Sequence, residues 1–428
     1  MGWTRRMAER AGTHGDVQVA VVGAGFIGRG LVSQLGIAPG MRCALLVNRS
    51  VERALDAWRA VGVEPDGVVV SDEPAKLAAA IDEGRPTVTR DAAILPELAR
   101  IDMVVEATGA MDHGATVILD ALTAGRDVVS MNAEVDATIG TLLRAEAERH
   151  DAVYTLGDGD QPGVLLRHLE FVSAMGFEVV AAVNCKRNLD IHQNPTDSRP
   201  YAERDGTSVL MTTAFGDGTK MQIENACVAN LSGLVPDRRG MHGVETSLAD
   251  AVDDICGVLS CRGVVEYTRG GDFGGGVAVI GHGEGELIQP YMRYSKMGDG
   301  PDYLFFRPYH LLHFEVPWTI AEVVLDRQIL GTARAAPVAD VVAVAKKPLE
   351  AGERLDGIGG FGVYGHIDTA AGADGFLPVG LAEHAIVTRA VHADEPVPLD
   401  AVELDEDAPL VALRRRQDAE VASATASG

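Results

Sequence analysis

Val17–Gly28, with the sequence VQVAVVGAGFIG, is the stretch that decides the fold. Its first half is a short apolar run rich in β-branched residues, which predicts a buried strand of a parallel sheet. Its second half is a G-x-G-x-x-G turn, and an apolar helical pattern follows it from Arg29 to Leu35. A strand, this turn and a helix in this order are typical of a turn that binds the phosphates of a dinucleotide.

The three glycines of the turn have separate physical roles. Gly23 permits the tight bend, Gly25 lets the backbone approach a pyrophosphate, and Gly28 lets the helix pack against the strand. The start of the helix adds free N–H groups and a partial positive charge. We therefore expect five residues to bind the cofactor: Gly23, Gly25, Phe26, Ile27 and Gly28. The alternative is a glycine-rich turn in an α/β protein that binds no nucleotide.

Further strands and helices extend this unit in both directions. Apolar strand patterns recur at Cys43–Val47, Asp102–Glu106 and Asp127–Ser130, and helical patterns lie between them. Strands that alternate with helices predict a doubly wound parallel sheet. We expect an α/β protein with an N-terminal Rossmann domain over residues 1–155.

The remaining chain has a different texture. A strand at Glu178–Asn184, a helix at Met221–Asn230 and clusters of glycine predict a central α+β domain over residues 156–335, for substrate binding and oligomerisation. We expect a helix at Trp318–Ile329 to close it. Val338–Ala345 opens a third, β-rich unit over residues 336–413, and residues 414–428 read as a flexible tail.

Composition and charge limit the class of protein. The 428 residues carry a net charge of −25 and are 46% hydrophobic, which excludes global disorder. The acidity argues against nucleic acid and against an anionic membrane as partners, because both attract basic surfaces. No apolar run approaches the ~18 residues that span a bilayer. Five scattered cysteines fit reduced thiols, so we expect a cytoplasmic protein.

The residues after the second strand bear on the choice of cofactor. An enzyme that uses NAD places a carboxylate there to accept from the ribose 2′-hydroxyl. This chain has Asn48 and Arg49, with Arg53 one helical turn later. Guanidinium groups suit a 2′-phosphate, so we expect NADP in preference to NAD. The alternative is that Arg49 and Arg53 are the solvated start of a helix.

Two other strand ends are expected to contact the cofactor, because ligands of open α/β sheets bind beyond the carboxyl ends of the strands. Ala107, Thr108 and Gly109 follow one strand, and their small size would admit a nicotinamide ribose. Asn132 follows the next strand and is placed for a carboxamide or a substrate. A turn residue is an equally good interpretation of Asn132.

Several segments resemble one family of homoserine dehydrogenase-like oxidoreductases that carry a C-terminal SAF domain. The matching segments occur in order and span almost the whole chain: VSMNAEVD (129–136), GDGDQPG (157–163), NPT (194–196), DGTK (217–220), VANLSG (228–233), LVPDRRGMHG (234–243), KMGDGP (296–301), RPYHL (307–311), DGIGG (356–360) and LPVGLA (377–382). The resemblance implies an oxidoreductase. That family includes reductoisomerase-like enzymes that convert 1-deoxy-D-xylulose 5-phosphate into 2-C-methyl-D-erythritol 4-phosphate. True homoserine dehydrogenases carry an Asn-Lys pair where this chain has Asn132 and Ala133, which puts homoserine itself in doubt.

Reducing a carbonyl by hydride transfer needs a donor for the developing alkoxide and an acid to protonate it. Lys186 and Lys220 lie beside polar segments and are our candidates, the alternative being surface ion pairs. Glu224 follows Lys220 by four residues, so a helix would put both on one face. That pair is either a catalytic couple or a structural salt bridge.

Carboxylates in the GDGDQPG loop suggest two further roles. Asp160 is a candidate catalytic carboxylate, and with Asp158 it offers hard oxygen ligands to Mg²⁺ or Mn²⁺. Such a metal would assist an α-hydroxyketone that rearranges before reduction.

A small anionic substrate needs cationic and polar contacts. In so acidic a chain, local basic groups stand out, and arginine recognises phosphate with two hydrogen bonds. The expected substrate contacts are Asn194, Arg238, Arg239, His242, Arg307 and His310. Charges at helix ends are the alternative interpretation.

Three functions remain open at this point. The leading hypothesis is an NADP-dependent oxidoreductase acting on a small polar carbonyl compound, in one version a reductoisomerase on a sugar phosphate. The second is a homoserine-like hydroxy-acid or amino-acid dehydrogenase. The third, of another class, is a non-catalytic protein that senses NADP. We expect a homo-oligomer, a dimer or a tetramer, in which the SAF module caps the active site or builds the interface. His366 and Asp368 read as a turn.

Overall fold

Strand β1 (Val17–Val22) forms because five of its six residues are apolar and lie in a sheet that is covered on both faces, and these five are buried. In the computed structural model, which describes residues 2–187 and 189–427, the chain divides into two compact units. Unit 1 holds the chain up to Asp160 together with Leu311–Leu330. Unit 2 holds Gln161–His310 and the chain from Gly331 onward.

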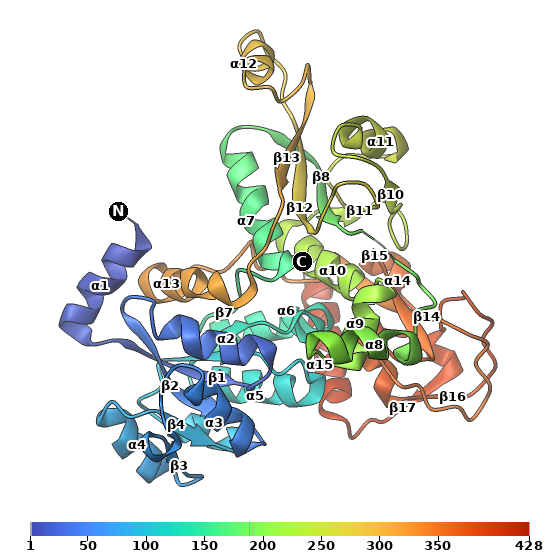
Figure 1. Cartoon of the computed structure of the whole chain (residues 1–428). Helices are drawn as coiled ribbons and strands as arrows, with labels where there is room; N and C mark the ends of the chain where they lie inside the picture. Colours follow the sequence, from blue (N-terminus) through green and yellow to red (C-terminus); the bar gives the residue numbers. More distant parts are fainter. Residues whose placement is uncertain (1, 188, 428) are drawn as a thin grey trace. The chain divides into compact units, whose positions relative to one another are not determined.

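Unit 1 is built on a seven-stranded parallel sheet with the strand order β3-β4-β2-β1-β5-β6-β7 (Figure 1). The other strands are β2 (Met41–Val47), β3 (Val69–Val70), β4 (Thr87–Thr89), β5 (Met103–Glu106), β6 (Asp127–Ser130) and β7 (Tyr154–Leu156). The helices are α1 (Trp3–His14), α2 (Phe26–Leu35), α3 (Val51–Arg59), α4 (Pro74–Asp82), α5 (Met111–Thr123), α6 (Ala133–Arg149) and α13 (Val316–Asp326). The chain leaves β1 for β2 on one side and returns to β5 on the other, so the carboxyl ends of β1 and β5 border the crevice where such sheets bind ligands. The predicted Rossmann sheet is confirmed.

Unit 2 is built on a mixed sheet with the order β10-β11-β8-β12-β13, and β9 also pairs with β11. Its strands are β8 (Glu178–Cys185), β9 (Val235–Pro236), β10 (Val244–Glu245), β11 (Val264–Arg269), β12 (Gly276–His282) and β13 (Asp302–Arg307). Its helices are α7 (Gln161–Ala174), α8 (Pro195–Asp205), α9 (Val209–Gly216), α10 (Thr219–Ser232), α11 (Ala251–Val258) and α12 (Ile288–Tyr294). β12 and β13 form a long hairpin with α12 at its tip (Figure 1). The predicted α+β character is confirmed.

The C-terminal part of unit 2 is rich in short strands, as expected. β14 (Ala339–Ala345) pairs with β15 (Val363–Thr369), and β16 (Ala385–Val387) pairs with β17 (Val402–Leu404). The short helix α14 (Ala370–Ala373) follows β15. Hydrogen bonds tie β15 to α10: the N–H of Gly365 donates to the Thr219 hydroxyl, and the N–H of Ile367 donates to the Gln222 side chain, both at 2.9 Å.

The division of the chain differs from the predicted segments in two respects. The helix expected to close the central domain is α13, and it belongs to unit 1. Its apolar side chains join the unit 1 core, and Asp326 pairs with Arg6 of α1 at 2.6 Å. Residues 336–413 do not form a compact unit of their own, because the contacts between β15 and α10 make them part of unit 2.

The predicted flexible tail, residues 414–428, is wrong for most of its length. Helix α15 spans Pro409–Ser427. Arg414 is largely buried on it and pairs with Asp340 of β14 at 2.6 Å and with Asp418 at 2.8 Å. The Ala-rich composition that suggested fraying also favours helix. Among the described residues, no helix is both long and apolar enough to cross a membrane.

Candidate functional site

The glycine turn of unit 1 has the geometry expected from its sequence. Gly23 has φ +106°, and a Cβ there would lie 2.8 Å from the carbonyl oxygen of Ala107 at the end of β5. A Cβ on Gly28 would lie 1.8 Å from the carbonyl oxygen of Gly23. Neither position can hold a larger residue without moving backbone, because both glycines are in close contact with the chain itself.

Gly25 is different, because nothing lies within 4 Å of the position a Cβ would take. It is the N-cap of α2, it has no side-chain cap, and the first turn of α2 contains no acidic residue. Phe26 begins the helix with 54% of its surface exposed, and Ile27 packs against the core. An open helix N-terminus beside open space fits an anionic group such as a pyrophosphate.

Asn48 holds the turn in place. Its Oδ1 accepts from the N–H of Ala24 at 3.0 Å, and its Nδ2 donates to the carbonyl oxygen of Ser50 at 2.8 Å. Both ends of the Asn48 side-chain amide, which was expected to contact the cofactor, are therefore hydrogen-bonded to the protein backbone. Its value to the site is that it fixes the backbone of the turn.

Arg49 and Arg53 are exposed, and within the described part of the chain no ion pair engages either guanidinium. Ser50 caps α3 between them by accepting from the N–H of Arg53 at 3.4 Å. Burial lowers the pKa of His113 on α5, and the charge of Arg49 lowers it further, so a positive potential extends to the start of α5. The region after β2 can attract a phosphate.

The ends of β5 and β6 lie beside the turn. Ala107 and Thr108 touch the position of a Gly23 side chain, and Gly109 adopts φ +66°. Asn132 is fully buried and caps α6, because its Oδ1 accepts from the N–H of Val135 at 3.2 Å. The structure thus gives Asn132 the role of a turn and cap residue, which was the second interpretation.

Lys186 lies in a polar cluster of unit 2 that comes from four elements. Its Nζ donates to Oε1 of Gln161 at 2.5 Å, lies 3.7 Å from Oε2 of Glu224, and sits 5.4 Å from the centre of the Phe215 ring. Asn184 completes the cluster by donating to Oε2 of Glu224 at 3.0 Å. Only 15% of the Lys186 side chain is exposed. An ammonium held by two fixed acceptors can present a proton in one direction.

Glu224 and Lys220 both lie on α10, which is buried almost all round despite its polar residues. The carboxylate of Glu224 is 1% exposed and lies next to Lys186, a residue 38 positions earlier in the chain. Lys220 is 4% exposed at the start of the helix. The local spacing that suggested a Lys220–Glu224 couple therefore missed the lysine that the fold brings to Glu224.

Gln161 and Asn184 were not predicted as site residues. Gln161 begins α7, and its Nε2 donates to the carbonyl oxygen of Gly276 at 3.2 Å, which directs Oε1 toward Lys186. Asn184 precedes Lys186 by two residues on β8 and is 1% exposed. A polar residue inside the otherwise apolar EVVAAVN strand was the available signal for Asn184.

The predicted substrate residues mostly have structural partners. Asn194 caps α8 by accepting from the N–H of Thr196 at 2.9 Å. Arg239 pairs with Asp368 of β15 at 2.6 Å and lies over the Phe376 ring. His366 and Asp368 both lie within strand β15, so the predicted turn at these residues is wrong.

The other basic candidates are spread over unit 2. Nε2 of His242 donates to Oδ2 of Asp237 at 2.8 Å. Desolvation raises the pKa of Asp237, but hydrogen bonds from Ser260 and His242 outweigh it and hold that pKa far below its usual range. Arg238 is exposed, and no ion pair among the described residues involves it. Arg307 lies over the Tyr309 ring, with its guanidinium carbon 5.0 Å from the ring centre. His310 is partly buried nearby in sequence.

Asp158 and Asp160 offer little to a metal ion. The backbone N–H of Asp158 donates to the Thr319 hydroxyl at 2.8 Å, and that hydroxyl lies 3.2 Å from Oδ2 of Asp158. Asp158 is 2% exposed. Within residues 2–187 and 189–427, no group of three or more His, Cys, Asp or Glu side chains is placed to hold a metal ion. The metal stays a prediction that these contacts do not support.

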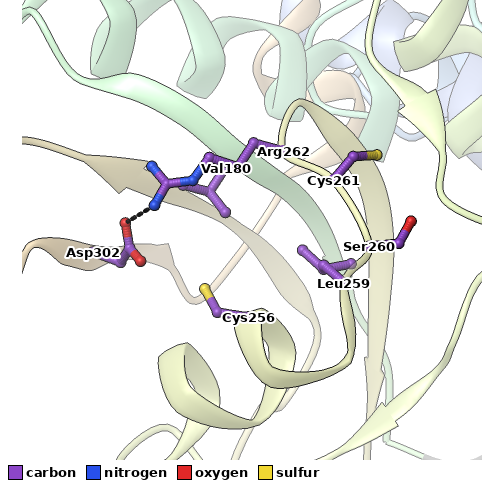
Figure 2. Close-up of a pocket in the computed structure, with 7 residues that line it drawn as sticks. All are labelled: Val180, Cys256, Leu259, Ser260, Cys261, Arg262 and Asp302. Carbon is purple, nitrogen blue, oxygen red and sulfur yellow. Dashed lines mark ion pairs between the residues drawn. The ribbon is translucent and has the colours of Figure 1, made fainter.

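A hollow of about 330 Å³ lies between α11, the following loop and the sheet of unit 2 (Figure 2). Arg262 and Asp302 form an ion pair of 3.6 Å across it, and Cys256 and Cys261 line it. In Figure 2 the Cys256 thiol points toward the ion pair, whereas the Cys261 thiol points away from it. None of the predicted site residues lines this hollow.

Comparison with known proteins identifies the class. Residues 23–156 match the family described as "Homoserine dehydrogenase, NAD binding domain", and residues 159–316 match "Oxidoreductase DRL, catalytic domain". The chain is therefore an oxidoreductase with a nicotinamide-cofactor-binding fold. In particular, residues 23–156 are similar to a homoserine dehydrogenase NAD-binding domain and residues 159–316 to a DRL catalytic domain, which confirms the predicted resemblance over these residues. The SAF domain remains a prediction.

Curated proteins provide no match to the chain. Solved structures similar to it include a probable dehydrogenase from Thermotoga maritima, at 12% identity and a TM-score of 0.43, covering 74% of this chain and 91% of that one. Scyllo-inositol dehydrogenase from Lactobacillus casei, with bound NAD(H) and scyllo-inositol, has 12% identity and a TM-score of 0.42 and covers 74% and 92%. DOX-P reductoisomerase in complex with magnesium has 18% identity and a TM-score of 0.36 and covers 51% and 58%. The two family matches, rather than these distant likenesses, define the class.

Proposed function

We propose that this protein is an NADP(H)-dependent oxidoreductase that reduces a small, polar, anionic carbonyl compound, with Lys186 as the proton donor. The observation that carries the proposal is the Lys186 ammonium held by Gln161 and Glu224 inside the segment that matches an oxidoreductase catalytic domain.

The chemistry divides between the cofactor and the protein. When bound, the reduced nicotinamide supplies the hydride. The protein must hold the substrate carbonyl and protonate the alkoxide that develops on it. Lys186 has three donor protons, of which one is used by Gln161, so others remain for a substrate oxygen. Asn184 holds the Glu224 carboxylate, which lies 3.7 Å from the Lys186 ammonium.

Arg49 and Arg53 support NADP as the cofactor. Both guanidinium groups follow β2, where the adenosine ribose of a dinucleotide is bound, and neither has a counter-charge among the described residues. A 2′-phosphate would supply that counter-charge. The absence of a carboxylate at Asn48 and Arg49 removes the usual acceptor for the free 2′-hydroxyl of NAD.

The substrate is proposed by chemistry rather than by name. Arg238 and Arg307 are cations of unit 2, and a guanidinium group suits a phosphate or a carboxylate. A phosphorylated α-hydroxyketone such as 1-deoxy-D-xylulose 5-phosphate would make the protein a reductoisomerase. An amino-acid semialdehyde would make it a plain dehydrogenase, which is the alternative.

The test follows the nicotinamide absorbance of NADPH in the presence of phosphorylated ketoses and of amino-acid semialdehydes, with and without Mg²⁺. We expect turnover with one of these classes. Lys186→Met should lower kcat by about 10²–10⁴-fold, the usual contribution of a general acid, and leave the Kd for NADPH unchanged. Lys347→Met is the matched control, because Lys347 is exposed and pairs with Glu353. Equal activity of Lys186→Met and wild type would refute the role of Lys186. Tight NADPH binding without turnover would favour the third function, an NADP sensor.

Assembly and location are also proposals. We propose a cytoplasmic homo-oligomer, and the large exposed side chains around α12 support an interface there: Leu287, Tyr291 and Tyr294. The five cysteines are all free thiols, which is compatible with a reducing compartment. Light scattering of the wild type and of Tyr291→Ser/Tyr294→Ser tests the interface.

A further inference from the structure

Glu106 is a buried carboxylic acid at the ligand-binding edge of the unit 1 sheet. It is the last residue of β5, in register with Val22 of β1 and Ser130 of β6. Its side chain is fully buried. The carboxyl ends of β1 and β5 border the crevice in which open α/β sheets bind ligands, so Glu106 stands at the edge of the sheet where a ligand would bind.

Glu106 determines the shape of the loop that follows it. Its Oε1 accepts from the N–H of Thr108 at 2.8 Å and also from the Thr108 hydroxyl. The Thr108 hydroxyl oxygen in turn accepts from the N–H of Ala110 at 3.2 Å, just before α5 begins. A single carboxylate oxygen therefore anchors the loop 107–110 directly, and through Thr108 it anchors the entry into α5.

This loop packs directly on the glycine turn. A Cβ on Gly23 would lie 2.8 Å from the carbonyl oxygen of Ala107 and 3.2 Å from Cα of Thr108. A shift of the loop by a few tenths of an ångström therefore either presses on the turn or leaves a gap beside it. Because Glu106 anchors this loop, it determines how closely the loop approaches the glycine turn.

The strand order indicates which half of a dinucleotide is affected. β2 and β5 flank β1 on opposite sides. The adenosine ribose is read at the end of β2, and the pyrophosphate lies at the start of α2 beyond β1. The nicotinamide half must then continue toward β5, where the loop 107–110 lies.

We propose that Glu106 is a positioning residue for the nicotinamide half of the cofactor, and that it acts through Thr108. The inference rests on the proposed function, because it needs a nicotinamide cofactor at this edge. It goes beyond that function by assigning a role to a residue that touches neither substrate nor cofactor.

The burial of Glu106 supports a role beyond folding. Its Oε2 has no hydrogen-bond partner within the described part of the chain. Burial raises the pKa of Glu106, and the hydrogen bonds from Thr108 together with the nearby Asn132 side chain oppose that rise. A buried polar atom without a partner destabilises the fold, and an apolar side chain at this position would avoid that loss. Asn132 and Gly114 enclose the carboxyl so closely that a Cβ on Gly114 would lie 3.2 Å from its Cδ.

The experiment compares the binding of two ligands to the wild type and to three variants. The ligands are NADPH and 2′,5′-ADP, a fragment that contains the adenosine 2′-phosphate but no nicotinamide. Glu106→Ala removes the acceptor, and Glu106→Gln keeps a neutral acceptor for Thr108. We expect Glu106→Ala to raise the Kd for NADPH about tenfold and to leave the Kd for 2′,5′-ADP within twofold of wild type, and Glu106→Gln to restore most of the loss. Thr108→Val should repeat the Glu106→Ala pattern, and it serves as the test if Glu106→Ala does not fold.

The possible outcomes separate this inference from the proposed function. An equal rise in both Kd values, or no change in either, would overturn the positioning role while leaving the cofactor assignment standing. Failure of Glu106→Gln to restore NADPH binding would also count against it, because the geometry requires only an acceptor at this place. Wild-type protein that binds neither ligand would overturn the proposed cofactor, and this inference with it.

Discussion

The Nζ of Lys346 lies 2.8 Å from Oδ2 of Asp217, and the two side chains are 3% and 0% exposed. Lys346 follows β14, and Asp217 ends α9, so the pair joins segments 129 residues apart. The other two protons of Lys346 go to the carbonyl oxygens of Gln193 and Gly360, each at 2.8 Å. With all three donors used, this ammonium ties the C-terminal strands to the helices of unit 2. The pair thus gives a physical reason why residues 336–413 are not a separate unit.

Lys346→Met should destabilise the protein by about 3–5 kcal/mol, because it leaves the Asp217 carboxylate buried without its counter-charge. The measurement is urea unfolding followed by circular dichroism. Lys347→Met is the control, since the exposed Lys347–Glu353 pair should contribute less than about 1 kcal/mol. Equal effects of the two variants would show that the buried pair is not the link.

Arg49→Ala should reduce the preference for NADPH over NADH. Removing the guanidinium beside a 2′-phosphate should lower kcat/KM for NADPH about tenfold, the loss of one charge-assisted contact, and leave kcat/KM for NADH unchanged. Arg59→Ala, at the last residue of α3 and paired with Asp56, should change neither value. A tenfold loss with both cofactors would mean that Arg49 stabilises the site rather than selecting the phosphate.

Local sequence signals predicted unit 1 well. The strand β1, the turn and α2 depend on neighbouring residues, so their pattern is legible from the chain alone. α13 was recognised as a helix but assigned to the wrong unit. Its placement depends on Arg6 and Thr319 meeting Asp326 and Asp158, and such contacts leave no local pattern. α15 was taken as a frayed tail because the burial of Arg414 against Asp340 depends on a strand 74 residues earlier.

The candidate site shows the same division. Gly23 and Gly28 were predicted because their constraint is local, within the turn and with the strand beside it. The contact between Glu224 and Lys186 was not predicted, because the i,i+4 spacing pointed to Lys220. The fold places Nζ of Lys186, just after β8, 3.7 Å from Oε2 of Glu224. Asn48 was predicted to touch the cofactor; in the structure it bonds to Ala24 and Ser50, and its contact with a cofactor stays a prediction. A side chain in the right place can serve the backbone of a site instead of its ligand.

Acid should weaken the protein through His366 of β15. Burial lowers the pKa of His366 to about 4, and the charges of Arg239 and Arg238 add to that effect, against Asp394. In the unfolded chain the histidine side chain has a pKa of about 6.5. Between about pH 6.5 and 4 the unfolded state therefore binds a proton at His366 that the folded state does not bind. Stability must therefore fall as the pH falls through this window, by about 2–3 kcal/mol for full protonation.

The urea midpoint at pH 7 and pH 5 measures this dependence. His366→Gln should lose part of the wild-type decrease, because the glutamine has no proton to bind. His392→Gln should behave as wild type, since His392 is exposed. An unchanged decrease in His366→Gln would assign the acid sensitivity to other groups.

Two alanine substitutions in the glycine turn should affect different properties: Gly25→Ala should weaken NADPH binding, and Gly28→Ala should lower the melting temperature. Gly25→Ala adds a methyl group where nothing lies within 4 Å, at a φ of −77° that alanine readily adopts, so the melting temperature should stay within about 2 °C of wild type. The methyl group would occupy the space next to the open start of α2, where a pyrophosphate must approach, and the Kd for NADPH should rise at least tenfold. Gly28→Ala places its methyl group 1.8 Å from the carbonyl oxygen of Gly23, so it should lower the melting temperature by several degrees because the helix must move away from the turn. Thermal melts and NADPH titration of both variants decide the matter. If Gly25→Ala binds NADPH as tightly as wild type, the cofactor does not lie along this turn, since any pyrophosphate seated there would meet the added methyl group.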